Sequence, residues 1–310
     1  MSILTPTPEA IQTAARTIRQ GGVVVIPTET VYGIACDALN KDAVMRVFEV
    51  KGRPSDNPLI VHISDWDMLE MVAQDIPPLA KKFAEKYWPG PLTLVLPKRP
   101  EVPMETTGGL NSVAVRMPRH RVALDVIRQA ERPIAAPSAN VFMALSPTRA
   151  QDIDPEILVE VDVILDGGPC EVGLESTVLD LTDDTPRILR PGAITRADIQ
   201  AITGRPLGLN PPPDVRKSPG MYRRHYAPNA RVVLVDALTE GQIGLSFEEP
   251  ANPQQIKMPD DPIAYGAVLY TALRRLDKPE TDTIFVQEPP DEPQWEAVLD
   301  RLRKASASLR

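Results

Sequence analysis

The stretch Lys51-Gly-Arg53-Pro-Ser-Asp-Asn57-Pro-Leu-Ile-Val-His62 joins the end of a helical pattern to an apolar run that is typical of a buried strand. Two cations, Lys51 and Arg53, lie on a loop that Pro54 and Pro58 stiffen. A fixed pair of cations at the mouth of a strand suits an anion, and phosphate is the commonest candidate. A solvated turn is the alternative interpretation, and the loop alone leaves both open.

The residues before this loop predict an α/β fold. Thr7-Pro8-Glu9 begins a helix, because threonine caps, proline fits the first position and an acid favours the first turn. Gly21-Gly22 ends that helix, and Val23–Ile26 follows as a buried strand that runs into a polar turn at 27–33. Asn40 caps a second helix that leads to the loop. Alternating strands and helices at this spacing indicate α/β architecture.

Strands and helices alternate in the rest of the chain as well. We expect helices at 65–87 with a break at Pro77-Pro78, at 120–130, at 195–204 with Thr195 as its cap, at 265–275 and at 294–305. We expect strands at 92–96, 112–117, 161–165, 176–181, 187–190, 231–236 and 283–287, and a Pro-rich loop at 247–262.

The length of 310 residues is more than one hydrophobic core usually organises, so two domains are expected. Residues 206–230 contain six prolines, four Lys or Arg and one acid, between acidic flanks. This composition predicts a stiff, basic connector. The predicted division is a catalytic domain at 1–205, a linker at 206–230 and a small α/β domain at 231–310.

The composition excludes several classes of protein. Apolar residues make up 43% and charged residues 25%, as in globular proteins, and no run approaches the ~18 apolar residues of a membrane span. No secretory signal is visible, and Cys36 and Cys170 form no CxxC pair, so we expect a cytoplasmic protein without a zinc ribbon. The histidines His62, His120 and His225 show no metal-ligand spacing, and no protein-bound metal is expected. A net charge of −8 argues against a general nucleic-acid binder.

Polar residues gather at the predicted strand ends, where ligands bind in open α/β sheets. Four cations among them would neutralise a triphosphate, or a phosphate and a carboxylate. His62 also fits a core histidine, and Ser138 and Asn140 fit a simple turn. Arg116 and Arg190 are harder to explain that way, because an unpaired buried cation is costly. There is no GxSxG, Walker A or GxGxxG sequence, so no glycine cradle is expected. The strand-end residues are Thr28, Thr30, Lys51, Arg53, Asn57, His62, Ser112, Arg116, Ser138, Asn140, Ser176 and Arg190.

Ordered motifs along the chain resemble the YrdC family, in its long two-domain form. The catalytic-domain motifs are Pro27–Gly33, Lys51–Pro54, Asn57–Leu59, Trp88–Thr93, Val115–Pro118, Pro137–Asn140, Ser146–Thr148, Glu175–Val178 and Leu189–Gly192. The connector motifs are Ser218–Met221 and His225–Pro228, and the tail motifs are Leu269–Arg274 and Asp300–Leu302.

The resemblance implies a twisted open mixed sheet with helices, followed by a small Rossmann-like α/β domain. It also implies a nucleotidyltransferase that condenses L-threonine, bicarbonate or CO2 and ATP into threonylcarbamoyl-AMP, releasing pyrophosphate. The product would pass to the downstream tRNA threonylcarbamoyl transferase machinery, which makes the t6A modification. Mg²⁺ would be held mainly through the ATP phosphates.

The same resemblance implies roles for individual residues. L-threonine would be held by Thr30, His62, Arg116, Ser176 and the backbone at Ala136. ATP would be held by Arg53, Asn57, Ser112, Ser138, Asn140, Ser146, Arg190 and Tyr226. Lys51 and Arg53 would be catalytic, adding positive charge near the reacting groups.

The connector is expected to fold over the nucleotide as a lid, with Arg223 and Arg224 near phosphate and Tyr226 on ATP. The sequence departs from the family pattern at Tyr222-Arg223 in the connector and at Phe142-Met143 in a site loop. One alternative function is an RNA-binding or ribosome-maturation module of YrdC-like fold. A carbamoyl-transfer enzyme is a second alternative, against which the missing zinc-finger cysteines count.

Overall fold

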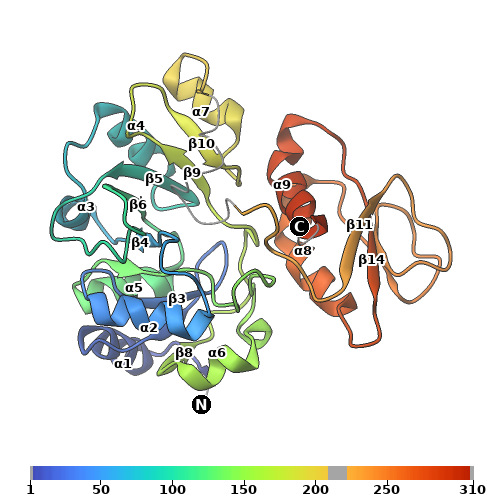
Figure 1. Cartoon of the computed structure of the whole chain (residues 1–310), viewed down its shortest axis with the longest axis horizontal. Helices are drawn as coiled ribbons and strands as arrows, with labels where there is room; N and C mark the ends of the chain where they lie inside the picture. Colours follow the sequence, from blue (N-terminus) through green and yellow to red (C-terminus); the bar gives the residue numbers. More distant parts are fainter. Residues whose placement is uncertain (1–2, 209–221, 308–310) are drawn as a thin grey trace.

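The computed structural model describes residues 3–208 and 222–307, and the strands of these residues form two sheets (Figure 1). The larger sheet has ten strands in mixed orientation and the smaller has four parallel strands. In spatial order the larger holds β1 (Ile3–Leu4), β8 (Val163–Leu165), β2 (Val24–Ile26), β3 (Gly33–Asp37), β7 (Ile134–Ala135), β4 (Ile60–His62), β6 (Ser112–Arg116), β5 (Leu92–Pro97), β9 (Thr177–Asp180) and β10 (Arg187–Arg190). The smaller holds β11 (Arg231–Val235), β14 (Thr283–Gln287), β12 (Gly244–Ser246) and β13 (Gln255–Lys257). The predicted α/β fold with a second small domain is confirmed.

The helices begin where the capping residues predicted them. Thr7 caps the first helix, Asn40 accepts from two backbone amides of the second, and Thr195 forms a capping box with Asp198. The helices that accompany the larger sheet are α1 (Pro8–Arg19), α2 (Lys41–Lys51), α3 (Trp66–Val72), α4 (Pro78–Tyr87), α5 (Arg121–Ala130), α6 (Pro155–Glu160) and α7 (Arg196–Thr203). The tail helices are α8 (Pro262–Leu276) and α9 (Glu296–Ser306), and short 3₁₀ turns lie at Ala150–Asp152 and Pro293–Trp295.

Several short elements differ from the sequence prediction. The chain continues from the expected polar turn into β3, which pairs antiparallel with β2. The segment expected to be a Pro-rich loop contains β13, which pairs with β12. These strands are three to five residues long, and their pairing partners rather than their local sequence stabilise them.

The small domain presents its helices to the large one. In Figure 1, α8 and α9 lie between the large sheet and the β11–β14 pair. The hydrophobic core of the small domain also includes Val31, Leu145 and Leu174 from the first two hundred residues, together with Tyr226. Residues of both parts therefore contribute to this apolar cluster next to the connector, while the large sheet has a separate core of its own. Within the described residues, no helix has the length and apolar character that crossing a membrane requires.

The linker prediction at 206–230 falls largely on residues 209–221, which lie outside the described part of the chain. The motif Ser218–Met221 lies there too. The domain limits 1–205, 206–230 and 231–310 therefore stay a prediction. Residues 222–230 are described, and His225 and Tyr226 are buried against the large domain.

Candidate active site

Strand register brings several of the predicted ligand-binding residues to one pocket. β4 and β6 are parallel neighbours, and His62 pairs directly with Arg116 at the carboxyl ends of both strands. The turn before β3 brings Thr30, the segment after β7 brings Ser138, and Ser176 directly precedes β9. The remaining cavity is about 50 Å³, little more than the ~30 Å³ share of one water molecule.

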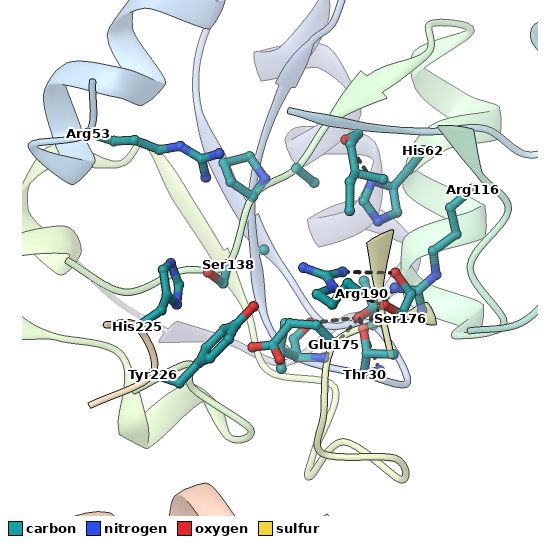
Figure 2. A pocket seen from close by; sticks show the side chains of 16 residues that line it. Thr30, Arg53, His62, Arg116, Ser138, Glu175, Ser176, Arg190, His225 and Tyr226 are labelled. Atoms are coloured by element: carbon teal, nitrogen blue, oxygen red, sulfur yellow. Dashed lines mark hydrogen bonds between the residues drawn. The ribbon is translucent and has the colours of Figure 1, made fainter. Parts of the chain in front are cut away.

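Figure 2 shows two groups of labelled side chains, with Arg190 and Glu175 between them: Thr30, His62, Arg116 and Ser176 on one side, and Arg53, Ser138 and Tyr226 on the other. Ala136 lines the pocket too. The predicted residues that do not line the cavity are Lys51, Asn57, Ser112, Asn140 and Ser146. Ser112 begins β6, two residues before Ala114, which pairs with Ile60. The roles of the five residues that do not line the cavity stay predictions.

Arg116 is held by three oxygens on the first side of the pocket. Its Nη2 lies 2.7 Å from Glu29 Oε1, its Nη1 donates to Thr30 Oγ1 at 2.9 Å, and its Nε donates to the carbonyl of Gly90 at 3.2 Å. Burial would raise the pKa of Glu29, but the Arg116 guanidinium outweighs it, and the pKa is lowered. The pair is therefore ionised, and the guanidinium is fixed in orientation.

His62 is neutral in this pocket. Burial, followed by the neighbouring Arg116 cation, lowers the pKa of His62 to about 3. Nδ1 lies 3.2 Å from the carbonyl oxygen of Ile60, which can only accept, so Nδ1 carries the proton. Nε2 is then left as a hydrogen-bond acceptor.

On the other side, Lys51 organises the loop that carries Ser138 and Asn140. Its Nζ donates to the carbonyl of Ser138 and to that of Asn140, the latter at 2.5 Å. Burial lowers the pKa of Lys51 well below its ordinary value. The oxygens around Lys51 Nζ are hydrogen-bond acceptors, which favour the ammonium form, so Lys51 is a cation here.

Buried polar atoms without hydrogen-bond partners also lie around this side of the pocket. Within the described residues, Arg53 Nε, both side-chain polar atoms of Asn57, and Tyr226 Oη are buried without a hydrogen-bond partner. Native structures contain few such atoms, and a ligand is a common reason for them. Burial lowers the pKa of Arg53 only to about 10, so it stays a cation at neutral pH.

Ser176 and Arg190 connect the two sides. Arg190 donates from Nε to the carbonyl of Ser176 at 3.0 Å and from Nη2 to its hydroxyl at 3.1 Å. The hydroxyl of Ser176 is also 2.7 Å from that of Thr93. A residue of one predicted subsite therefore fixes a residue of the other.

The sequence analysis assigned no role to Glu29, Glu175 or Arg301. Glu175 lines the pocket and accepts from Ser146 at 2.6 Å, from Tyr270 at 3.0 Å and from Arg301 at 2.8 Å. Burial would raise its pKa, but Arg301 and then Arg190 lower it to about 2. Glu29 and Glu175 lie in quoted motifs, and that position was the only signal available.

The expectation that Arg223 and Arg224 lie near phosphate stays a prediction, and in this ligand-free structure neither arginine is at the pocket. Neither lines the pocket; Arg223 lines a surface groove with Asp300 and Lys304, and Arg224 lines another with Phe142 and Arg274. Phe142 and Met143 also lie outside the pocket lining. Tyr226, by contrast, reaches the pocket as expected.

Comparison with known proteins covers the whole chain. A family profile described as "Telomere recombination" matches residues 16–192, and one described as "Threonylcarbamoyl-AMP synthase, C-terminal domain" matches 194–307. Threonylcarbamoyl-AMP synthase of Pyrococcus abyssi is 42% identical, over 96% of this chain and 94% of that protein. The chain belongs to the two-domain threonylcarbamoyl-AMP synthase family.

Other members of the threonylcarbamoyl-AMP synthase family agree in sequence and in structure. The Bacillus subtilis threonylcarbamoyl-AMP synthase is 41% identical over 96% of this chain and 92% of its own length. The crystal structure described as P. abyssi Sua5 complexed with L-threonine superimposes with a TM-score of 0.89 at 41% identity, covering 96% of this chain and 94% of that one. The resemblance to the long YrdC form and the prediction of an adenylyl-transferring enzyme are confirmed.

Proposed function

We propose that this chain condenses L-threonine, bicarbonate or CO2 and ATP into threonylcarbamoyl-AMP and pyrophosphate in the pocket described above. The observation that carries the proposal is the convergence of two sets of buried donors on one cavity. The related structure with L-threonine supports threonine as one of the ligands. As a threonylcarbamoyl-AMP synthase, the chain serves the t6A modification of tRNA.

L-threonine is assigned to the side of Arg116. A guanidinium pairs with a carboxylate through two parallel hydrogen bonds, and Arg116 is already oriented by Glu29 and Thr30. The free Nε2 of His62 suits the threonine hydroxyl as an acceptor. Ser176 and the backbone at Ala136 complete this subsite.

ATP is assigned to the opposite side. Arg53, Asn57 and Tyr226 offer buried polar atoms that have no partner within the described residues, and Arg190 adds a second guanidinium. Arginines suit phosphate because their donors match its oxygens. The remaining members of this proposed set are Ser112, Ser138, Asn140 and Ser146.

The reaction needs no side-chain nucleophile. The neutral amine of threonine attacks CO2, a C–N bond forms, and the amine loses a proton to give a carbamate. A carbamate oxygen then attacks the α-phosphorus of ATP, and the bond to the bridging oxygen of pyrophosphate breaks. The chain aligns the two ligands, while Lys51, Arg53 and Arg190 provide positive charge around the phosphates.

Mg²⁺ fits this site as a partner of ATP rather than of the chain. The described residues contain no group of three His, Cys, Asp or Glu that could hold a metal ion. Arg53, Asn57 and Arg190 would hold the phosphates that carry it, and the ion would offset phosphate charge.

The division into a catalytic domain (1–205), a linker (206–230) and an α/β domain (231–310) is part of this proposal. The product would pass to the tRNA threonylcarbamoyl transferase machinery, because a mixed anhydride is reactive and needs an acceptor. The chain itself is not expected to bind nucleic acid stably, given its net charge of −8.

Pyrophosphate release tests the proposal. The full-length protein with ATP and Mg²⁺ should release pyrophosphate only when L-threonine and bicarbonate are both present. Equal release without threonine would contradict the assigned reaction. A gel shift with bulk tRNA at moderate salt tests the RNA-binding alternative, and we expect no stable complex.

A further inference from the structure

Arg301 belongs to α9 of the small domain, but its guanidinium reaches the wall of the active-site pocket. The side chain is fully buried and pairs with two carboxylates. Nε lies 2.8 Å from Glu175 Oε2, and Nη1 lies 2.6 Å from Oδ2 of Asp300, which also pairs with Lys304. The two residues are 126 positions apart in the sequence. Glu175 lines the pocket and Arg301 does not, so Arg301 contacts the pocket only through Glu175.

The Arg301 guanidinium also binds two backbone carbonyls, one next to Ser176 and one next to Arg190. Nη2 donates to the carbonyl of Glu175 at 3.3 Å, and Nη1 donates to the carbonyl of Pro191 at 3.0 Å. Glu175 directly precedes Ser176, and Pro191 directly follows Arg190. Since Arg190 also bonds Ser176, the contacts form a closed ring through both segments.

The negative charge of Glu175 links this ring of contacts to ATP binding. Its pKa is lowered to about 2, so the carboxylate is ionised at neutral pH. The cations responsible are Arg301 first and Arg190 second. If Arg301 did not balance this carboxylate, Glu175 would compete with the ATP phosphates for Arg190.

We propose that Arg301 of the small domain is a positioning residue that balances the charge of Glu175 and so keeps that carboxylate from drawing Arg190 away from ATP. It also aligns Ser176 with Arg190. The inference rests on the reaction proposed above. It gives the small domain a defined part in that reaction: α9 must be docked for both substrate segments to be in place. The guanidinium also lies 5.0 Å from the ring centre of Tyr226, which adds the connector to the same cluster.

Four variants of the full-length protein separate charge balance from simple domain attachment. Arg301→Met removes the cation, and Arg301→Met with Glu175→Gln removes both charges. Arg301→Lys keeps the charge but cannot reach all four oxygen acceptors together, namely Glu175 Oε2, Asp300 Oδ2 and the carbonyls of Glu175 and Pro191. The matched control is Arg196→Met, which removes an ion pair between the two domains, Arg196 Nη2 to Glu296 Oε1 at 2.8 Å, outside the pocket.

Initial rates of pyrophosphate release are measured against ATP and against threonine, with thermal melting of each variant. We expect Arg301→Met to raise KM for ATP about tenfold or more, because it leaves a buried charge uncompensated. The double variant should recover most of that loss in KM. Arg301→Lys should stay within about threefold of the wild-type KM for ATP and have a lower kcat. Arg196→Met should leave both constants unchanged.

The inference is overturned if Arg301→Met changes KM for ATP no more than Arg196→Met does, or if the double variant is no better than the single one. If Arg301→Met does not fold, Arg301→Lys decides: an ATP KM raised tenfold despite the retained charge contradicts charge balance. Failure of the wild-type protein to need threonine and bicarbonate would instead contradict the proposed function. The two failures are therefore distinguishable.

Discussion

Glu29 and Arg116 form a buried ion pair at the wall of the pocket, which Arg116 lines, with Oε1 and Nη2 2.7 Å apart and side chains 2% and 3% exposed. Both charges are removed from water, so loss of either partner would leave the other as an unpaired buried charge, which destabilises the fold. Glu29 fixes one nitrogen of the guanidinium, and Thr30 fixes the other. Arg116 is thereby oriented before a carboxylate arrives, which lowers the entropic cost of binding it.

Arg116→Lys should weaken threonine binding by ~1.5–3 kcal/mol, the range for a charged hydrogen bond. Lysine keeps the charge but cannot form two parallel bonds to a carboxylate. ATP binding should change much less. Calorimetry with each ligand checks this, and the exposed Arg119, treated in the same way, is the control. A larger loss for ATP than for threonine would reassign Arg116 to the nucleotide.

The neutral state of His62 predicts a pH dependence of stability. Its pKa is about 3 in the folded chain, whereas the ordinary value is 6.5. Protons therefore bind the unfolded chain more readily between these values, and the free energy of unfolding falls as pH falls below 6.5. The slope from one such group is about 1.4 kcal/mol per pH unit. Glu29 and Arg116 are the charges that face His62.

Urea unfolding at pH 6.5, 6.0, 5.5 and 5.0 measures this slope. His62→Gln should reduce it by about one proton's contribution, leaving the share of the two other histidines, whose pKa values are also lowered. An unchanged slope in His62→Gln would mean that His62 is already charged in the folded chain.

Tyr226 should act as part of a lid. It is 2% exposed, and the cavity it helps to enclose is about 50 Å³, well below the ~300 Å³ of ordinary ligand sites. Tyr226 therefore has to move for ATP to enter, and we expect it to close again on ATP and threonine together. Tyr226→Ala should lower activity while residues 1–205 keep their fold, as circular dichroism can check.

Trypsin reports the same motion, since Arg223 is exposed and Arg224 is partly exposed. ATP with threonine should slow cleavage after both arginines, and Tyr226→Ala should abolish that protection. Cleavage that is as fast with both ligands as without them would make the connector a spacer.

Lys51→Met should destabilise the fold and weaken ATP binding together. It removes the donor to the carbonyls of Ser138 and Asn140 and leaves buried oxygens unpaired. We expect a loss of about 2–6 kcal/mol in the free energy of unfolding, from about one to three kcal/mol for each of the two unpaired carbonyls. Urea unfolding and ATP calorimetry measure the two effects. The exposed Lys82 provides the control substitution. Loss of ATP affinity without loss of stability would instead point to direct contact with phosphate.

Local sequence signals predicted the elements that carry the site but not the charge partners within it. Helix caps at Thr7, Asn40 and Thr195 are short-range features, and the structure confirms each. The strand ends at His62 and Arg116 were predictable from the apolar runs before them. Their direct pairing was not, because strand order is set by non-local contacts.

The carboxylates show the same limit. Glu29 and Glu175 lie in polar turns, where sequence alone cannot distinguish a solvated acid from a buried one. Their role depends on Arg116 and Arg301, which lie far away in the chain. From the sequence alone, Arg301 is indistinguishable from an ordinary cation on a helix surface, because its burial depends on the contact between α9 and the large domain.

The central claim is that one pocket joins threonine, a one-carbon unit and AMP. Full-length protein incubated with ATP, Mg²⁺, L-threonine and ¹³C-bicarbonate, followed by rapid mass spectrometry, tests it most directly. The account predicts an adenylate that contains threonine and carries the ¹³C label, and that is missing when any one substrate is omitted. An adenylate that contains threonine without the label, or AMP formation that ignores bicarbonate, would contradict it.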